Sequence, residues 1–373
     1  MKFLFQLFGC LVLVNLSWSQ RCLPVVDQQL DFLCKELSVV GLSAVVIKDS
    51  FIVGRYNYGE VIHKIQGQYV TSSMDNRRDL WKIASVTKNI IALAIMQLCD
   101  RGKCSLEDDV NKYLPYIVKN RLYPNSKITI RMLLSHYSSI ARGQYEIIKP
   151  FKIPYIKDRP GEKYIYSNIN YLLLGAIIES VAGERFDRYV QTNIFKPLGI
   201  KVYFNPYETL SDDLVYGKWV NRRNELELCD TYQIYKLADI NNYKLKLSTQ
   251  ALDPAGGAII SIDDLCKYTM FIMGSSDSRQ RIISESALKQ MRIPRSYESF
   301  YGLGTIDYSY LIKGEKMYGH TGYAYGIYTS LIYNPDRKYG FIIFCNGVMT
   351  DYANALLTLH APIIKVLYES YIN

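Results

Sequence analysis

The sequence predicts an α/β (α+β) protein built around one mainly antiparallel sheet. Strand patterns gather near both ends of the chain, at residues 41–61 and 327–347, whereas helical patterns dominate the middle. No linker rich in Gly, Ser or Pro separates these regions, and no internal repeat is visible. We therefore expect the terminal strands to pair in one sheet covered by N- and C-terminal helices. The helical middle would form an inserted lobe, with a ligand cleft between the lobes.

The first third of the chain predicts a helix, a hairpin and a second helix. Apolar residues recur at helical spacing over residues 24–38. Residues 41–61 have the pattern of two short strands that turn at Lys48-Asp49-Ser50. A strongly apolar helix then follows Lys88 and ends at Gly102.

The remaining sequence predicts more helices and a second hairpin. Residues 201–250 are polar and rich in tyrosine, and they predict no clear element. A helix is expected to begin near Ser261, whose hydroxyl can cap it. The other expected elements are helices over 128–140 and 353–370, two helices over 166–200 divided at Gly183, and a hairpin over 327–347 that turns at 334–336.

The N-terminus resembles a secretory signal peptide over residues 1–19. Lys2 precedes an apolar run, and Ser17 and Ser19 supply the small residues that a cleavage site requires. We expect the remainder, residues 20–373, to be one domain. Its sheet lobe would span about 20–80 and 255–373, and its helical lobe about 81–254. No later segment predicts a membrane span, so the mature chain is expected to be soluble and secreted, lumenal or periplasmic.

Charge and histidine content argue against several kinds of partner. The net charge is +9, but the basic residues are scattered and form no stripe or recognised nucleic-acid module. The four histidines are far apart, and neither HExxH nor a paired CxxC motif occurs. We therefore expect no nucleic-acid partner, no metal site and no cofactor. The sequence leaves the oligomeric state open.

The cysteines suit an oxidising compartment. Cys22 and Cys34 could bracket the first helix, and Cys99 and Cys104 could close a small loop. Cys345 lies in an apolar stretch, which predicts a buried, inert thiol. The sequence does not fix the disulfide pairing.

Ser85 and Lys88 are the first candidates for chemistry. They form a Ser-x-x-Lys motif at the start of the most apolar helix of the chain. Three residues apart on a helix, the two side chains can meet, and a buried lysine that has lost its proton can accept one from serine. The alternative is that Ser85 merely caps the helix. A second Ser-x-x-Lys, at Ser286, lies in a polar segment and predicts a solvated lysine.

Several longer segments together resemble the serine β-lactamase and penicillin-binding-protein superfamily, in its class C-like branch. These segments are IASVTKNIIALAIMQLCDRGK, ITIRMLLSHYSSI, PGEKYIYSNINYLLLGAIIESVAGERF, DPAGGAIISIDDLCKY and YGHTGYAYGIYTSLIYNP, and they occur in the order typical of the family. The resemblance runs from about residue 40 to the C-terminus and is poor over residues 201–250.

The resemblance implies a role for each motif residue. Ser85 would be the acylated nucleophile, Lys88 its proton partner and Tyr166 a phenol that shares acid and base duties. Asn168 would bind the substrate amide, and the other substrate-binding residues would lie on one strand: His320, Gly322 and Tyr323. Backbone N–H groups of Ser85 and Tyr323 would form the oxyanion hole.

Each of these roles has a structural alternative. Tyr166 could be ordinary packing in a chain with 33 tyrosines, Asn168 a helix N-cap and His320 a satisfied structural histidine. His136 is expected to be structural.

Departures from the family pattern bear on the substrate. Tyr137 and Ser139 replace the usual Thr and Gly, and His320 stands where many relatives have lysine. A neutral imidazole anchors a carboxylate less firmly than an ammonium group does. The sequence thus favours an exported peptidase, amidase or esterase that acts on a small-molecule or peptide substrate through a Ser85 acyl-enzyme. The alternatives are a non-catalytic relative of the same fold and a true β-lactamase or D,D-carboxypeptidase.

Overall fold

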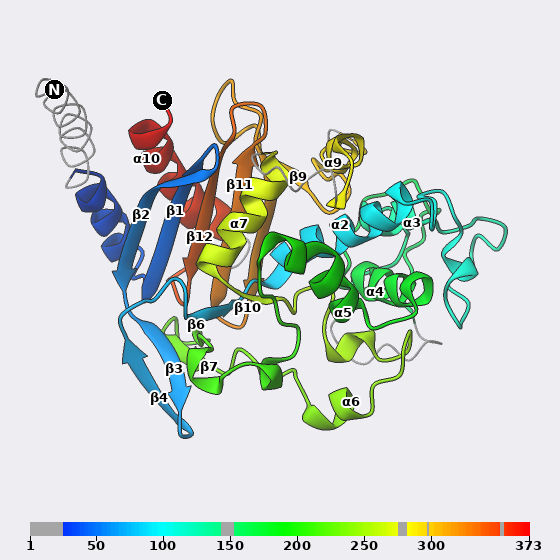
Figure 1. Ribbon diagram of the computed structural model, residues 1–373, viewed down its shortest axis with the longest axis horizontal. Coiled ribbons are helices and arrows are strands. Elements are labelled where there is room, and N and C mark those ends of the chain that lie inside the picture. Colours follow the sequence, from blue (N-terminus) through cyan, green and yellow to red (C-terminus); the bar gives the residue numbers. More distant parts are fainter. Residues whose placement is uncertain (1–24, 143–152, 275–281, 297, 351–353) are drawn as a thin grey trace, which may run out of the picture.

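The computed structural model describes residues 25–142, 153–274, 282–296, 298–350 and 354–373. The signal peptide predicted at 1–19 and one cysteine of the suggested pair, Cys22, lie outside these residues. A large sheet and its covering helices occupy one side of the molecule, and most other helices the opposite side (Figure 1). Within the described ranges, no helix combines the length and the apolar character that crossing a bilayer requires.

The main sheet joins the two ends of the chain, as the sequence predicts. All neighbouring strands are antiparallel, and the central pairing runs from Leu42 opposite Cys345 to Lys48 opposite Tyr339. In spatial order the strands are β2 (Phe51–Gly59), β1 (Gly41–Lys48), β12 (Tyr339–Cys345), β11 (Ile327–Asn334), β10 (Tyr318–Ala324) and β9 (Ile306–Asp307).

Helices cover both faces of this sheet, which explains why β1 is buried from Gly41 to Ile47 and mostly apolar. Ala44 and Val46 face a core shared with the helical residues 25–36 and α10 (Ala361–Tyr371). Val45 and Ile47 face the opposite core, which includes α7 (Ile262–Met273). Successive side chains of a strand point to opposite faces, so a strand that is covered on both sides must be apolar over most of its length.

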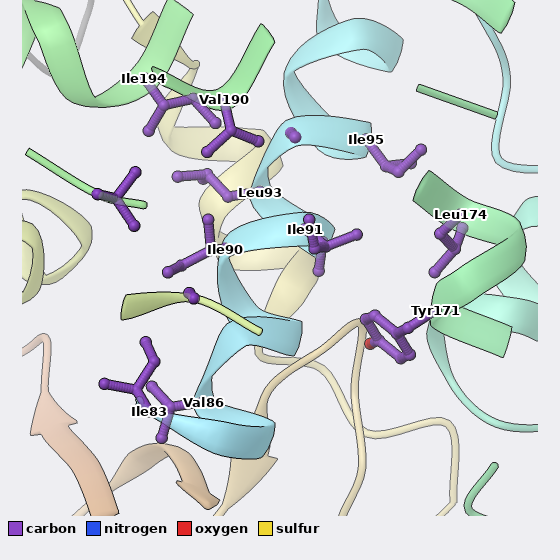
Figure 2. Packing of buried hydrophobic residues seen from close by; sticks show 14 of the residues in the cluster. Ile83, Val86, Ile90, Ile91, Leu93, Ile95, Tyr171, Leu174, Val190 and Ile194 are labelled. Atoms are coloured by element: carbon purple, nitrogen blue, oxygen red, sulfur yellow. The ribbon is translucent and has the colours of Figure 1, made fainter. Parts of the chain in front are cut away.

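Several other helices gather around α2 (Thr87–Asp100), which is the centre of the larger core. Every residue from Thr87 to Leu98 is buried. Figure 2 shows Ile91 and Ile95 directed toward Tyr171 and Leu174 of the neighbouring helix. The helices that contact α2 include α4 (Asn168–Ala182), α5 (Phe186–Val190) and α9 (Glu285–Met291), and α3 (Ile130–Leu134) packs on α4. The short α6 (Leu237–Asn241) lies farther from α2 (Figure 1).

Three two-stranded ribbons complete the fold, and one of them positions the nucleophile candidate. Residues 201–250, for which the sequence gave no prediction, contain one ribbon, α6 and short 3₁₀ turns. The ribbon of β5 and β8 leads directly into the turn that carries Ser85. The pairs are β3 (Val61–Ile65) with β4 (Gln68–Ser72), β5 (Leu80–Lys82) with β8 (Ile259–Ser261), and β6 (Gly217–Val220) with β7 (Leu226–Cys229).

Most predicted elements are confirmed, but the helix expected over 128–140 is too long. α3 ends at Leu134, because His136 and Ser139 both adopt a left-handed backbone with φ of 62°. This conformation interrupts an α-helix. The cap expected at Ser261 is present, since its hydroxyl accepts a hydrogen bond from the backbone N–H of Asp264.

The cysteines of the described residues are all thiols. The Sγ atoms of Cys99 and Cys104 lie 3.1 Å apart, whereas a disulfide bond is about 2.05 Å long. Their side chains therefore adjoin without the predicted bond. Cys345 is fully buried as expected, and burial raises the pKa of its thiol to about 12.

Candidate active site

Ser85 lies in a short 3₁₀ turn, η1 (Ala84–Val86), between β5 and α2. Ala84 has a left-handed φ of 46°, a strained conformation for a residue with a side chain. The N-cap of α2 is Val86, and no side chain makes a capping hydrogen bond there. The alternative that Ser85 serves only as the cap of this helix is therefore wrong.

Lys88 is fully buried and faces Ser85. Its Nζ donates hydrogen bonds to Ser85 Oγ at 3.0 Å and to the carbonyl oxygen of Ala255 at 2.6 Å. Burial disfavours the charged ammonium form and lowers the pKa of Lys88 to about 7. A substantial fraction of the amine is thus neutral near pH 7, and a neutral amine can accept the proton of a serine hydroxyl.

The strand β10 passes directly over the turn that holds Ser85. Among the described residues, β9 pairs with Tyr318 and Gly319 alone, and no described strand pairs with the following residues of β10 on that side. A Cβ atom at Gly322 would lie 2.4 Å from Ile83 O and 3.0 Å from Ser85 N. Only glycine allows this close approach of the strand to the turn.

Tyr323 follows on the same strand with its side chain turned away. Its ring packs against Tyr328, with centroids 4.7 Å apart, and belongs to the core on the α10 side of the sheet. The ring of Tyr323 thus lies on the opposite face of the sheet from the Ser85 turn, and the backbone role that the family resemblance implies for Tyr323 stays a prediction.

His320 is buried and neutral. Its Nδ1–H donates to the carbonyl oxygen of Thr321 at 2.6 Å, which leaves Nε2 to accept a hydrogen bond from Tyr301 Oη at 3.0 Å. Burial, followed by the charge of Lys88, lowers the pKa of His320 to about 3. Both ring nitrogens are engaged within the protein, so this imidazole supplies no positive charge to a ligand at neutral pH.

Tyr166 lies between Lys88 and the histidines. Its ring centroid is 5.0 Å from Lys88 Nζ, 4.3 Å from the ring of His136 and 6.4 Å from the ring of His320. The sequence motifs at 85–88, 166 and 320 are far apart in the chain, and the fold brings all of them to one place.

Asn168 is the first residue of α4, so its N-cap alternative is wrong. The cap is Ser167, and its side chain makes no capping bond. Asn168 Oδ1 is buried and has no hydrogen-bond partner among the described residues. An unsatisfied amide oxygen next to a candidate site can receive a donor from a ligand.

His136 packs against the ring of Tyr166, with the two ring centroids 4.3 Å apart. Its Nδ1 accepts hydrogen bonds from the backbone N–H of Ser167 at 3.2 Å and from Asn170 Nδ2 at 3.0 Å. The neutral ring therefore carries its hydrogen on Nε2, and burial holds its pKa well below the usual range. The expectation that His136 is structural agrees with these contacts. Tyr301 was missed by the sequence reasoning, because no motif surrounds it.

Comparison with known proteins identifies the family. A sequence model of the β-lactamase family matches residues 26–362. The chain belongs to the β-lactamase family. This membership confirms the resemblance drawn from the motifs and the predicted fold. The wider superfamily contains serine hydrolases, among them amidases and β-lactamases.

Individual relatives of this β-lactamase family chain are distant. Protein flp of Staphylococcus aureus strain N315 is 23% identical over 344 residues, which are 86% of this chain and 62% of flp. The chain thus spans less than two thirds of the length of that relative. The structure of an octameric penicillin-binding protein homologue from Pyrococcus abyssi is similar to this one, with a TM-score of 0.69 and 25% sequence identity. The match covers 90% of this chain and 77% of the Pyrococcus chain.

A third relative is an enzyme of known structure. The D-amino acid amidase from Ochrobactrum anthropi SV3 has a TM-score of 0.70 and 20% identity, covering 92% of this chain and 97% of its own. At this identity the comparison establishes a shared fold.

Proposed function

We propose that the protein is a serine hydrolase that cleaves esters or amides through an acyl-enzyme on Ser85. The observation that carries the proposal is the 3.0 Å contact between Ser85 Oγ and a buried lysine whose pKa is lowered to about 7. A serine hydroxyl becomes a useful nucleophile only when a neighbour takes its proton. The contact of Lys88 with Ser85 and its lowered pKa support this role for Lys88.

The proposed acylation begins with proton transfer from Ser85 Oγ to the neutral amine of Lys88. Oγ then forms a bond to the substrate carbonyl carbon, and the backbone N–H groups of Ser85 and Tyr323 stabilise the oxyanion. Collapse of this intermediate breaks the bond to the leaving oxygen or nitrogen. The leaving group takes a proton from Lys88 by way of the Tyr166 hydroxyl. Water then attacks the acyl carbon, and the same proton transfers in the opposite order release the acid and restore the Ser85 hydroxyl.

The site favours substrates that carry no carboxylate beside the scissile bond. His320 is neutral and has both nitrogens engaged, and burial lowers the pKa of Lys88 to about 7. No stable cation therefore faces the substrate from β10. A neutral ester or an amide, such as the amide substrates that the name of the Ochrobactrum enzyme indicates, fits this environment better than an anionic penicillin.

Covalent labelling tests the proposal. Intact mass would be measured after exposure to a fluorophosphonate and, separately, to a penicillin, with Ser85→Ala as the matched control. We expect a fluorophosphonate adduct on the wild type that is missing in Ser85→Ala, with slower or no labelling by penicillin. A folded wild-type protein that reacts with neither probe would contradict the proposal and favour a non-catalytic relative. Rapid hydrolysis of a chromogenic cephalosporin would favour a true β-lactamase.

We further propose that the chain is exported and that Cys99 and Cys104 form a disulfide in an oxidising compartment. The signal-like residues 1–19 and the 3.1 Å approach of the two Sγ atoms support this idea. Intact mass of protein secreted by an expression host, with and without reduction and alkylation, would detect both events. An uncleaved N-terminus or two freely alkylated thiols in exported protein would contradict it.

A further inference from the structure

A second buried lysine borders the turn that accepts the hydrogen bond from Lys88. Lys82, the last residue of β5, is 1% exposed, and its Nζ makes no hydrogen bond within the described part of the chain. Instead it lies over the rings of Tyr235 and Tyr325, at 4.9 and 5.1 Å from their centroids. The proposed hydrolysis uses neither Lys82 nor its carboxylate neighbour, so their burial needs another explanation.

The carboxylate neighbour is Asp253, which is also 1% exposed. Its Oδ2 lies 4.0 Å from Lys82 Nζ, and no ion pair joins it to Lys88 among the described residues. Asp253 begins a tight turn with a left-handed φ of 48°, and its carbonyl oxygen accepts hydrogen bonds from the N–H groups of Gly256 and Gly257. Ala255, inside the same turn, accepts the hydrogen bond from Lys88.

One turn therefore contacts both lysines, through Asp253 on one side and Ala255 on the other. Removing a charge from water is costly unless a partner of opposite sign is close. A lone carboxylate at this place would favour the ammonium form of Lys88, and indeed Asp253 raises the pKa of Lys88 against the effect of burial. Lys82 lies within 4.0 Å of the carboxylate and brings the compensating positive charge.

We propose that Lys82 and Asp253 form a buried ion pair that sets the proton affinity of Lys88, because the Lys82 charge cancels the Asp253 charge that would otherwise keep Lys88 protonated. The pair acts through Lys88 and touches no substrate, so both members are positioning residues. This inference rests on the proposed function only in so far as Lys88 is the proton acceptor.

Burial keeps His136, His320 and Tyr171, three other titratable groups around Lys88, neutral at pH 7. His136, from the loop after α3, and His320, from β10, both have pKa values lowered by burial. Tyr166 and Tyr171, at the start of α4, present ring faces at 5.0 and 5.5 Å from Lys88 Nζ, and burial raises the pKa of Tyr171.

The groups around Lys82 are neutral as well. Burial raises the pKa of Cys229 to about 11 and that of Tyr325 to about 12, and it raises the pKa of Tyr235 well above its usual value. Lys82 itself has a pKa lowered by burial to about 8, above the value of about 7 for Lys88. Asp253 raises the pKa of Lys88, and Lys82 in turn lowers the pKa of Asp253 against the effect of burial, so the carboxylate form of Asp253 depends on its lysine neighbours.

Charge-deleting variants at the two positions should have opposite effects. Only neutral Lys88 accepts a proton, so the labelling rate rises with pH through its pKa. Asp253→Asn removes a negative charge that raises the pKa of Lys88, so it should move this midpoint to lower pH, by about 1 unit. Lys82→Met removes a positive charge and should move it to higher pH. The double variant should return near the wild-type midpoint, and the exposed Lys163→Met serves as a charge control with no shift.

The measurement is the pH dependence of fluorophosphonate labelling, paired with ¹³C NMR titration of lysines labelled at Cε in the Ser85→Ala background. NMR reads the pKa of Lys88 without catalysis, and loss of its signal in Lys88→Met assigns it. The NMR titration could show the Lys88 pKa shifting in opposite directions in Asp253→Asn and Lys82→Met while the wild type is not labelled. This result would support the effect of the ion pair on Lys88 and refute the proposed hydrolase function. If folded Asp253→Asn and Lys82→Met proteins both label with the wild-type pH midpoint, the proposed effect of the ion pair on Lys88 is wrong, whereas the proposed hydrolase function stands.

One outcome does not depend on the folding of the pair variants. In Ser85→Ala protein with an otherwise native site, the proposal requires Lys82 to keep its proton at a pH where Lys88 has lost half of its own. If the NMR titration shows Lys82 deprotonating before Lys88, the proposal is wrong.

Discussion

The Gly322→Ala variant should change the position of β10 relative to the Ser85 turn without changing the contact between Lys88 and Ser85. It therefore tests the two contributions to the labelling rate separately. The added Cβ would lie 2.4 Å from Ile83 O, 2.5 Å from Thr329 Oγ1 and 3.0 Å from Ser85 N. Ordinary contact begins near 3.4 Å, so the strand and the turn must separate by about 1 Å. Two of these three atoms belong to the backbone, which cannot rotate aside as a side-chain tip can.

A separation of about 1 Å at this point acts on the proposed oxyanion hole. Misplacement of that size costs about 100-fold in rate, or about 2.7 kcal/mol of transition-state stabilisation. The contact between Lys88 and Ser85 lies within α2 and its preceding turn, so it should survive. The midpoint of the pH profile should therefore stay in place while the labelling rate falls. Overpacking should also lower the free energy of unfolding by about 1–3 kcal/mol.

The assay is the rate of fluorophosphonate labelling across pH, with urea unfolding to confirm the fold. Gly340→Ala on β12 is the matched control, because its Cβ would meet Thr269 Cγ2 at 3.2 Å and Tyr333 Cβ at 3.3 Å. These contacts need shifts of only a few tenths of an ångström, so this variant should label like the wild type. A folded Gly322→Ala protein that labels at the wild-type rate would refute the reasoning, since β10 would then play no part in the reacting geometry.

Four further outcomes are expected. Lys88→Met should slow labelling of Ser85 by about 10²–10⁴-fold in folded protein, which is the usual contribution of a general base, and an unchanged rate would exclude Lys88 as the acceptor. In the wild type, labelling should rise with pH through a midpoint near 7, because the pKa of Lys88 is lowered to about 7 and only the neutral amine is active; a flat profile between pH 5 and 9 would contradict this. Tyr301→Phe should lower the free energy of unfolding by about 1–3 kcal/mol in urea, because His320 Nε2 loses its donor, and a neutral effect would show that the bond is dispensable. Stability should also fall below pH 6.5, because His360 has a folded pKa lowered to about 4 and its unfolded form takes up a proton first; in His360→Gln the loss between pH 6.5 and 4.5 should shrink by about 1.4 kcal/mol per pH unit at most.

The sequence predicts the main sheet and the longest helices well because their signals are local or strongly periodic. β1 is mostly apolar and buried from Gly41 to Ile47, β12 is buried throughout since both faces are covered, and α2 is buried from Thr87 to Leu98. Ser85 and Lys88 are also a local signal, because helical geometry alone places residues three apart together. The break after Leu134 was missed because His136 and Ser139 adopt left-handed backbones without the glycine that usually marks them.

Buried polar partners that are distant in the chain could not be predicted. Lys82 resembles any solvated lysine in sequence, and only the pairing of β5 with β8 encloses it beside Asp253. Tyr301 is one of 33 tyrosines, and its hydroxyl becomes informative only when it faces His320 Nε2. Secondary-structure propensity and hydrophobic periodicity describe one helix or strand at a time, whereas these contacts join side chains from separate elements.

The electrostatics of the site follow from these non-local contacts and decide which substrate it suits. His136 and His320 are neutral because they are buried, and each has at least one ring nitrogen engaged in a hydrogen bond. Lys82 and Asp253 cancel in our proposal, and the acylating form of Lys88 is uncharged. The reacting site therefore carries almost no net charge, although the chain as a whole carries +9. A neutral site gives no advantage to an anionic substrate, whose charge would have to leave water without a partner. It does favour a transition state whose single developing charge, on the oxyanion, meets two backbone donors. The histidine on β10 in place of the lysine that many relatives carry therefore supports the proposed preference for neutral esters and amides over penicillins.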